Sequence, residues 1–167
     1  MRAGAFSPQG SHVACGTADG AVCVWEVASR SVTTLAGSGS AGSNDGVGTN
    51  ARFYSPWGVA TTADGATVYV AETTADRIRK IEVSSGTVTT LAGYYNSAAF
   101  IDGVGTTARF NAPRQIALTG GTLLVACGHD HTVAVTGDLK ARGWGRAQEG
   151  QLGVGAAEQL ESPRGVS

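Results

Sequence analysis

Charge is scarce in this sequence, and neither sign prevails. Of the 167 residues, 15% are charged, against about 25% in a typical soluble chain. The 12 Lys and Arg residues offset the 13 Asp and Glu residues. Such a balance gives no basic surface of the kind that binds nucleic acid or an anionic membrane. We therefore expect neither a nucleic-acid partner nor membrane association.

Cysteines and long apolar runs are also few. The 3 cysteines, Cys15, Cys23 and Cys127, are odd in number and too few for a disulfide framework. No apolar run approaches the roughly 18 residues of a membrane-spanning helix, and the first residues lack the apolar segment of a signal peptide. The default expectation is a reducing, cytoplasmic setting, in which Cys15 and Cys23 face each other in a hairpin as buried free thiols.

Proline is scarce, with 4 residues, whereas glycine is abundant, with 25. The glycines follow no three-residue period, which excludes a collagen-like chain. Hydrophobic residues make up 42% of the sequence, so the composition is not that of a disordered chain, and the length suits one domain. This composition is typical of an all-β protein rich in turns.

One stretch of sequence occurs twice. Val32 corresponds to Val88, which sets a repeat of about 56 residues. The matching segments are SVTTLAG (31–37) with TVTTLAG (87–93), DGVGTNARF (45–53) with DGVGTTARF (102–110), and SPWGVA (55–60) with APRQIA (112–117). A partial copy precedes this unit and a diverging copy follows it.

The pattern within each unit predicts short strands. Runs such as VYVAE, RIRKIEV and TVTTLA are rich in Val, Ile and Thr and are bounded by Gly, Asp and Ser. Residues 18–20 and 63–65, both Ala-Asp-Gly, are expected to form tight hairpin turns. Four short strands joined by hairpins form one blade of a β-propeller.

Three parts of the chain resemble three kinds of propeller repeat. Residues 31–126 are similar to NHL repeats, because VTTLAG, DGVGTNARF, SPWGVA and VYVAETTADRIRKIEV follow one another in that family's order. Residues 6–27 resemble a tryptophan–aspartate (WD) repeat, although Glu26 rather than Asp follows Trp25. Residues 126–155 resemble the repeat of the chromosome-condensation regulator family. The expected divisions are a WD-like blade (1–35), an NHL-type blade (36–91), a second NHL-type blade running into the third repeat type (92–160), and a tail (161–167).

Counting strands gives about three blades, whereas closed propellers have about four to eight. We therefore predict an all-β, partial β-propeller of about three four-stranded antiparallel blades that does not close as a monomer. A fragment of a larger propeller, a hybrid gene or a designed chimera would explain this. A homo-oligomer that completes the propeller would also do so.

Residues that recur in each unit are expected to serve the blade itself. Asp45 and Asp102, each followed by Gly, are predicted to form turns, and Phe53 and Phe110 to wedge between blades. The basic cluster around Arg77 and Arg79 has acidic neighbours of opposite charge, which favours a solvated strand face; the full set is Glu72, Asp76, Arg77, Arg79, Lys80 and Glu82.

The long connections 37–56 and 93–113 are the best candidates for binding, because long loops on a rigid scaffold commonly carry function. The second connection contains four large apolar side chains that the first lacks: Tyr94, Tyr95, Phe100 and Ile101. Rigid aromatic side chains are typical anchors of protein contacts, and the alternative is that they pack back onto the next blade. Trp57 and Arg114 occupy equivalent blade-entry positions but differ in chemistry, so either could line the central face.

No motif points to a cofactor, a metal or catalysis. GSGSAG (37–42) has glycine spacing seen in dinucleotide sites, but no helix is expected after it. His129, Asp130 and His131 lie near Cys127 but lack a further metal ligand. The three resemblances imply a non-catalytic scaffold that binds a protein partner. The alternatives are an RNA-binding NHL propeller, or a fragment of a larger regulatory or enzymatic propeller protein.

Overall fold

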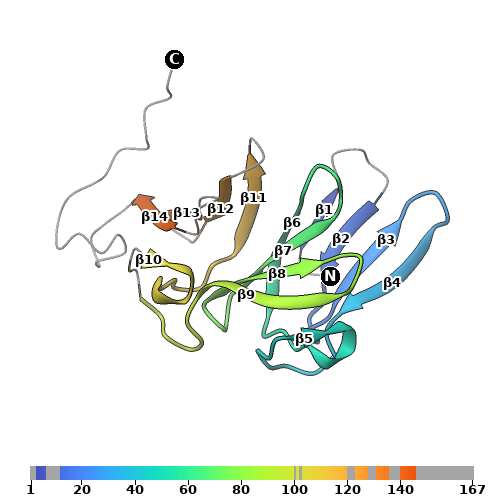
Figure 1. Cartoon of the computed structure of the whole chain (residues 1–167), viewed down its shortest axis with the longest axis horizontal. Coiled ribbons are helices and arrows are strands. Elements are labelled where there is room, and N and C mark those ends of the chain that lie inside the picture. The colour runs from blue at the N-terminus through green and yellow to red at the C-terminus, as the bar shows by residue number, and fades with distance from the viewer. Residues whose placement is uncertain are drawn as a thin grey trace, which may run out of the picture.

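Three antiparallel sheets lie side by side in the computed structural model (Figure 1). The structure describes residues 3–6, 12–99, 101, 103–119, 123–127, 131–135 and 140–145. Each sheet is one blade, and the strand order confirms the predicted partial β-propeller that does not close. Among the described residues, no helix is long and apolar enough to cross a membrane.

The first blade is a simple meander with the strand order β1-β2-β3-β4. Its strands are β1 (Ala3–Phe6), β2 (His12–Gly16), β3 (Val22–Glu26) and β4 (Ser31–Ala36). The turn predicted at residues 18–20 is present. Thr17 closes it, because the Thr17 hydroxyl binds the Asp19 carboxylate and accepts a hydrogen bond from Ala21 N at 3.0 Å.

The second blade has five strands in the order β5-β9-β8-β7-β6. They are β5 (Gly46–Val47), β6 (Pro56–Thr61), β7 (Thr67–Glu72), β8 (Arg77–Glu82) and β9 (Thr87–Gly93), and the 3₁₀ turn η1 (Gly48–Asn50) follows β5. The fifth strand was not predicted. It arises because the repeated Gly-Val pairs with the outer edge of β9, with Gly46 opposite Val88.

The third blade repeats this order as β10-β14-β13-β12-β11. Its elements are β10 (Gly103–Val104), η2 (Gly105–Thr107), β11 (Gln115–Thr119), β12 (Leu123–Cys127), β13 (His131–Val135) and β14 (Lys140–Gly145). Gly103 lies opposite Ala141, as Gly46 lies opposite Val88.

Strand alternation gives the second blade two apolar faces. Val68, Val70 and Ile81 point towards the first blade, whereas Ala71 and Ile78 point towards the third. Phe53 and Phe110 are fully buried in these two interfaces, which confirms that they wedge between blades. The core is thus the sum of the contacts between neighbouring blades.

Glycine is required where each outer strand leaves its blade. Gly37 and Gly93 have φ of +100° and +91°, a conformation that disfavours other residues. A Cβ at Gly93 would also lie 2.4 Å from the carbonyl oxygen of Asp76. The TLAG motif therefore recurs because the chain turns left-handed against the neighbouring hairpin.

Cys15 and Cys23 lie directly opposite each other in β2 and β3, and both are free thiols, as predicted. Cys15 is buried as predicted, whereas the prediction of burial is wrong for Cys23, which is partly exposed. Burial, together with the neighbouring Cys23, raises the pKa of the Cys15 thiol.

In the folded protein, Cys23 is expected to react with a maleimide at least tenfold faster than Cys15. The reactive species is the thiolate, and the raised pKa of Cys15 leaves less of it at pH 8. Mass spectrometry of the alkylated peptides over time would measure both rates. Equal rates in the folded protein, or a Cys15–Cys23 disulfide in protein kept under reducing conditions, would contradict this expectation.

Candidate interaction surface

The connection 93–113 is held by main-chain hydrogen bonds to the second blade and between its own two halves. Asn96 N donates to Ala75 O at 3.3 Å, and Ala99 N donates to Phe110 O at 3.2 Å. Ile101 and Arg109 form an isolated antiparallel bridge. The loop therefore presents its side chains from a fixed backbone.

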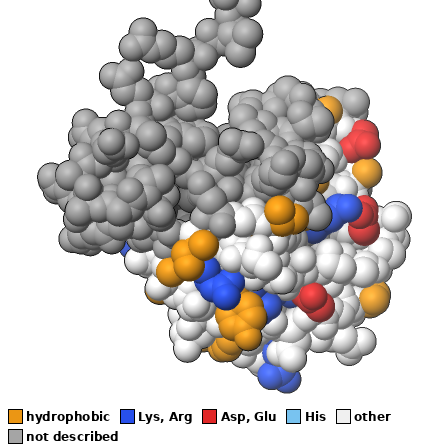
Figure 2. All heavy atoms as spheres, turned by 60° about the vertical axis from the view of Figure 1, so that its left-hand side comes forward, with side chains coloured by type: hydrophobic (Ala, Val, Ile, Leu, Met, Phe, Trp, Pro, Cys, Tyr) orange, Lys and Arg blue, Asp and Glu red, His pale blue; other side chains and the backbone are white. Residues whose placement is uncertain are grey.

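Three of its large apolar side chains point into solvent. Tyr94, Tyr95 and Ile101 are 55%, 46% and 52% exposed, and we call them the tyrosine surface. They are not buried against the next blade, which was the alternative prediction. Phe100, the fourth candidate, lies outside the described residues. Figure 2 shows hydrophobic and basic side chains next to one another on one face of the molecule.

Two arginines hold the tyrosine rings. The Cζ atom of Arg109 lies 4.6 Å from the centre of the Tyr94 ring, and that of Arg77 lies 5.3 Å from the Tyr95 ring. These distances are within the range of cation–π attraction. The Arg109 guanidinium is itself fixed, because its Nη1 donates to the carbonyl oxygens of Thr106, Thr107 and Ala108 at 2.9, 3.2 and 3.1 Å. Neither arginine was predicted as a partner of the rings.

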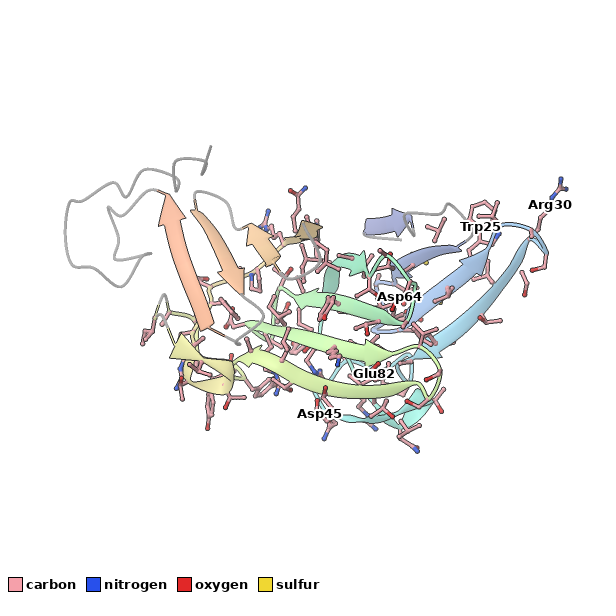
Figure 3. All side chains as sticks on the ribbon, turned by 45° about the horizontal axis from the view of Figure 1, so that its top comes forward. Trp25, Arg30, Asp45, Asp64 and Glu82 are labelled. Atoms are coloured by element: carbon pink, nitrogen blue, oxygen red, sulfur yellow. The ribbon has the colours of Figure 1, made fainter. Side chains whose placement is uncertain are left out.

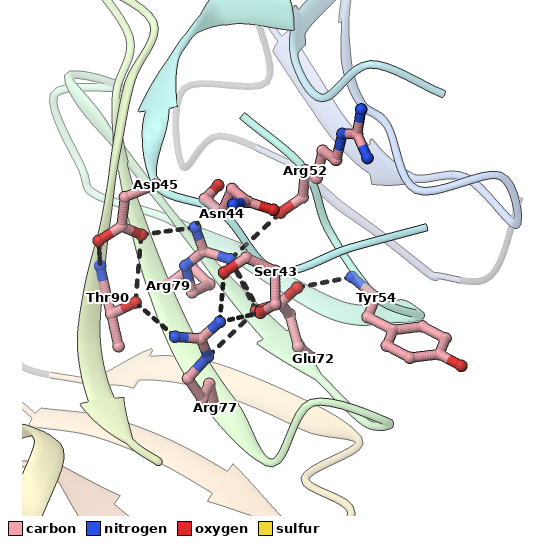
Figure 4. Close-up of polar contacts among 9 residues, drawn as sticks. All are labelled: Ser43, Asn44, Asp45, Arg52, Tyr54, Glu72, Arg77, Arg79 and Thr90. Atoms are coloured by element: carbon pink, nitrogen blue, oxygen red, sulfur yellow. Dashed lines mark hydrogen bonds and ion pairs between the residues drawn. The ribbon is translucent and has the colours of Figure 1, made fainter. Parts of the chain in front are cut away.

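Arg77 also belongs to a network of charged and polar groups whose centre is the buried Arg79 (Figure 4). The Arg79 guanidinium is fully buried and binds Glu72 Oε2 at 2.8 Å and Asp45 Oδ1 at 2.6 Å. It also donates to the Asn44 carbonyl at 3.1 Å. Asp45 in turn accepts a hydrogen bond from Thr90 N at 3.1 Å. The network therefore ties the loop before β5 to strands β8 and β9.

Glu72 and Arg77 complete the network. Glu72 accepts hydrogen bonds from Tyr54 N at 2.6 Å and from the Ser43 hydroxyl at 3.1 Å. Arg77 binds the Ser43 side chain, donates to Thr90 Oγ1 at 3.2 Å, and has its Nε 4.0 Å from Glu72 Oε2. Because Arg77 also stacks on Tyr95, it links the network to the tyrosine surface.

Burial dominates the electrostatics of these groups. It raises the pKa of Glu72, and the nearby Arg79 charge only partly offsets that rise. Burial and the charge of Arg79 lower the pKa of Arg77. The pKa of Asp76 is raised by burial as well, and its Oδ1 accepts a hydrogen bond from Ala112 N at 2.8 Å, which fixes the far end of the loop.

These contacts correct two predictions. The prediction that these charged residues form a solvated strand face is wrong for Glu72, Arg79 and Asp76, because all three are buried. It holds for Lys80 and Glu82, which are partly exposed and form a 2.5 Å ion pair. Arg79 is buried because it lies two residues from Ile81 on β8, so both side chains are on the face that packs on the first blade. The RIRKIE pattern already contained this signal.

The second correction concerns Asp45. It forms no turn, because Gly46 begins strand β5 and the Asp45 carboxylate reaches the sheet instead. Asp102 lies outside the described residues. Of the metal ligands considered, His129 and Asp130 also lie outside them. In the part of the chain that the structure describes, no three residues of metal-ligating type come together.

Neither neighbouring blade has an arginine at the position of Arg79. Arg79 lies opposite Thr90, and the register puts Cys23 at the same position in the first blade and Val133 in the third. The Asp-Gly motif recurs in the third blade without an arginine at the position of Arg79, so the motif alone does not predict this network. Comparing the units strand by strand would have singled out Arg79 as a residue that does not recur.

Trp57 and Arg114 form a separate pair near the inner strands. The Arg114 Cζ lies 5.7 Å from the Trp57 ring, so the two blade-entry residues contact each other across neighbouring blades. Trp57 lies on β6, the innermost strand, whereas Tyr94 follows β9. Three strand spacings, about 14 Å, separate these strands. The predicted residues thus form two groups rather than one.

No protein-family model matches the sequence, and no curated protein matches it. Solved structures do resemble it in fold. A protein of unknown function from Bacteroides thetaiotaomicron has a TM-score of 0.66 at 22% identity over 81% of this chain and 32% of its own. An auxiliary nutrient binding protein from the same organism has a TM-score of 0.63 at 15% identity, over 83% and 34%.

The WD40 repeats of RRP9 have a TM-score of 0.55 at 15% identity, over 88% of this chain and 39% of theirs. The chain therefore spans about a third of the length of the structures it resembles. At these identities the likeness shows the fold alone, and the chain is a partial β-propeller with WD40 proteins among its structural neighbours.

Proposed function

We propose that this chain is a non-catalytic protein-interaction segment of a β-propeller, and that the tyrosine surface contacts its partner. The observation that carries the proposal is the pair of exposed tyrosine rings held by fixed arginines. Tyr and Arg are enriched among the residues that dominate binding energy. Rings that are already ordered lose little conformational entropy on binding.

The surroundings of the rings support a protein partner over a nucleic acid. The guanidinium of Arg77 is engaged with Ser43, Thr90 and the Glu72 carboxylate, so it is not presented to phosphate. The net charge of the chain is −1, which provides no electrostatic attraction for RNA. The order of the repeated motifs supports the further proposal that the second and third blades are of NHL type.

The test uses a phage library of random peptides, selected on the full chain. We expect enriched peptides whose affinity falls at least tenfold when Tyr94 and Tyr95 are both replaced by alanine, about 1.4 kcal/mol or more. The folding stability of that variant should change by less than about 2 kcal/mol, because only two exposed cation–π pairs are lost. Titration calorimetry and urea unfolding would measure the two effects.

Tyr54→Ala is the matched control, since Tyr54 is an exposed tyrosine of the preceding connection. Its binding affinity for the same peptides should be unchanged. Peptides that bind the double variant as well as the original chain would refute the proposal. So would a single-stranded oligouridine that binds through the tyrosines when no peptide does.

A further inference from the structure

The first blade exposes apolar side chains on the face that points away from the second blade. Trp25, Val27 and Val32 are 39%, 38% and 63% exposed, and we call them the outer face. Trp25 and Val32 are cross-strand neighbours on β3 and β4. Figure 3 shows Trp25 on the blade that forms one end of the stack.

The same positions are core in the second blade. Ile81 pairs with Val88 as Trp25 pairs with Val32, and both Ile81 and Val88 are fully buried because the first blade covers them. The outer face is therefore a blade-packing surface whose neighbouring blade is not among the described residues.

The far face of the third blade exposes a position whose equivalent in the second blade is buried. At each internal interface, small alanine side chains of one blade pack against larger apolar side chains of the next. Ala14 and Ala36 of the first blade meet the Val and Ile residues of the second, and Ala60, Ala71 and Ala92 of the second meet the wedge of the third. In the third blade Ala117 corresponds to Ala60, and Ala117 is exposed whereas Ala60 is buried.

We propose that the outer face of the first blade is covered by the third blade of a second copy of this chain. One chain carries both halves of the interface, so the contact is head-to-tail and is made twice in a closed pair. The resulting ring has about six blades, within the usual range of propellers. Burial of the exposed apolar side chains stabilises the pair.

Light scattering coupled to size-exclusion chromatography tests this on the full chain. We expect a single species of twice the mass of one chain. Val32→Lys places a charge in the contact and should raise the dissociation constant at least tenfold. Val27→Lys, a second variant on the same face, should act in the same direction. Urea unfolding of each variant at low protein concentration establishes that it is folded.

Thr33→Lys is the matched control, because Thr33 is exposed on the same strand but alternates to its opposite face. It should leave the mass unchanged. Alkylation of Cys23 gives a second readout, since the register puts Cys23 on the outer face with Trp25. Its rate should fall as protein concentration rises. A mass of one chain at every concentration, a doubled mass unaffected by Val32→Lys, or a ladder of larger masses would each overturn the proposal.

Discussion

Arg79→Met is expected to lower the free energy of unfolding by about 3–5 kcal/mol. The substitution removes the cation that pairs with Glu72 and Asp45, and it leaves the fully buried Glu72 carboxylate without its main partner. A small domain is stable by only about 5–15 kcal/mol, so this variant should unfold at a much lower urea concentration. Equilibrium urea unfolding, followed by tryptophan fluorescence, would measure the shift in midpoint.

Lys80→Met is the matched control. Lys80 is adjacent in β8, but its ion pair with Glu82 is partly exposed and such pairs contribute about 0–1 kcal/mol. Adding Glu72→Gln to Arg79→Met should restore part of the lost stability, because the unpaired charge is removed. An Arg79→Met variant as stable as the Lys80→Met control would show that the network does not hold the loop.

The Arg79→Met variant should also respond to pH. Burial raises the pKa of Glu72, and the charge of Arg79 is the main effect that opposes this rise. The substitution removes that opposing effect. The folded-state pKa then lies further above the unfolded value of about 4.3. A raised folded-state pKa favours the folded protein only while the group is protonated, so stability is lost as pH rises above the unfolded value. The deficit relative to the original chain should be larger at pH 7 than at pH 5.

Phe53→Ala is expected to destabilise the chain by about 3–5 kcal/mol through the cavity it leaves. The ring is fully buried between the first two blades, with residues of both around it. It also lies 5.3 Å from the Arg79 guanidinium, so the loss exposes part of the charge network to a void. Urea unfolding gives the free energy, and an unchanged m-value indicates that stability alone has changed.

Tyr54→Ala is the control that distinguishes an effect of the Phe53 ring from an effect of the loop backbone. Tyr54 contributes its N–H to Glu72, but its side chain is exposed, so this variant should change stability by less than about 1 kcal/mol. A similar loss in both variants would show that the effect comes from the loop backbone and not from the wedge.

The contacts of the tyrosine surface explain why sequence reasoning found only half of it. Tyr94 and Tyr95 stood out because the first connection has no large side chain in their place. Arg77 and Arg109 did not, since Arg77 reaches its ring from strand β8 and Arg109 from the far end of the folded connection. The role of this surface in binding stays a proposal, as do the NHL, WD and chromosome-condensation types of the individual repeats.

The sequence by itself determined the features that depend on neighbouring residues. Strand alternation and the Thr-Ala-Asp-Gly hairpins are local patterns, because backbone conformation and side-chain period are set within a few residues. The repeat length and the recurrence of Phe53 as Phe110 can be found by comparing the sequence with itself. They were sufficient for an all-β partial propeller and for the facing cysteines Cys15 and Cys23.

Only the tertiary structure decided which faces are buried. Ile81 is core and Trp25 is exposed at the same position of two similar blades, because one blade has a neighbour on that face and the other has none among the described residues. Arg79 is buried for the same reason, and its charge is tolerated because Glu72 and Asp45 reach it from β7 and from the loop before β5. Burial is a property of the contact between blades, so the pattern within one blade could not settle it.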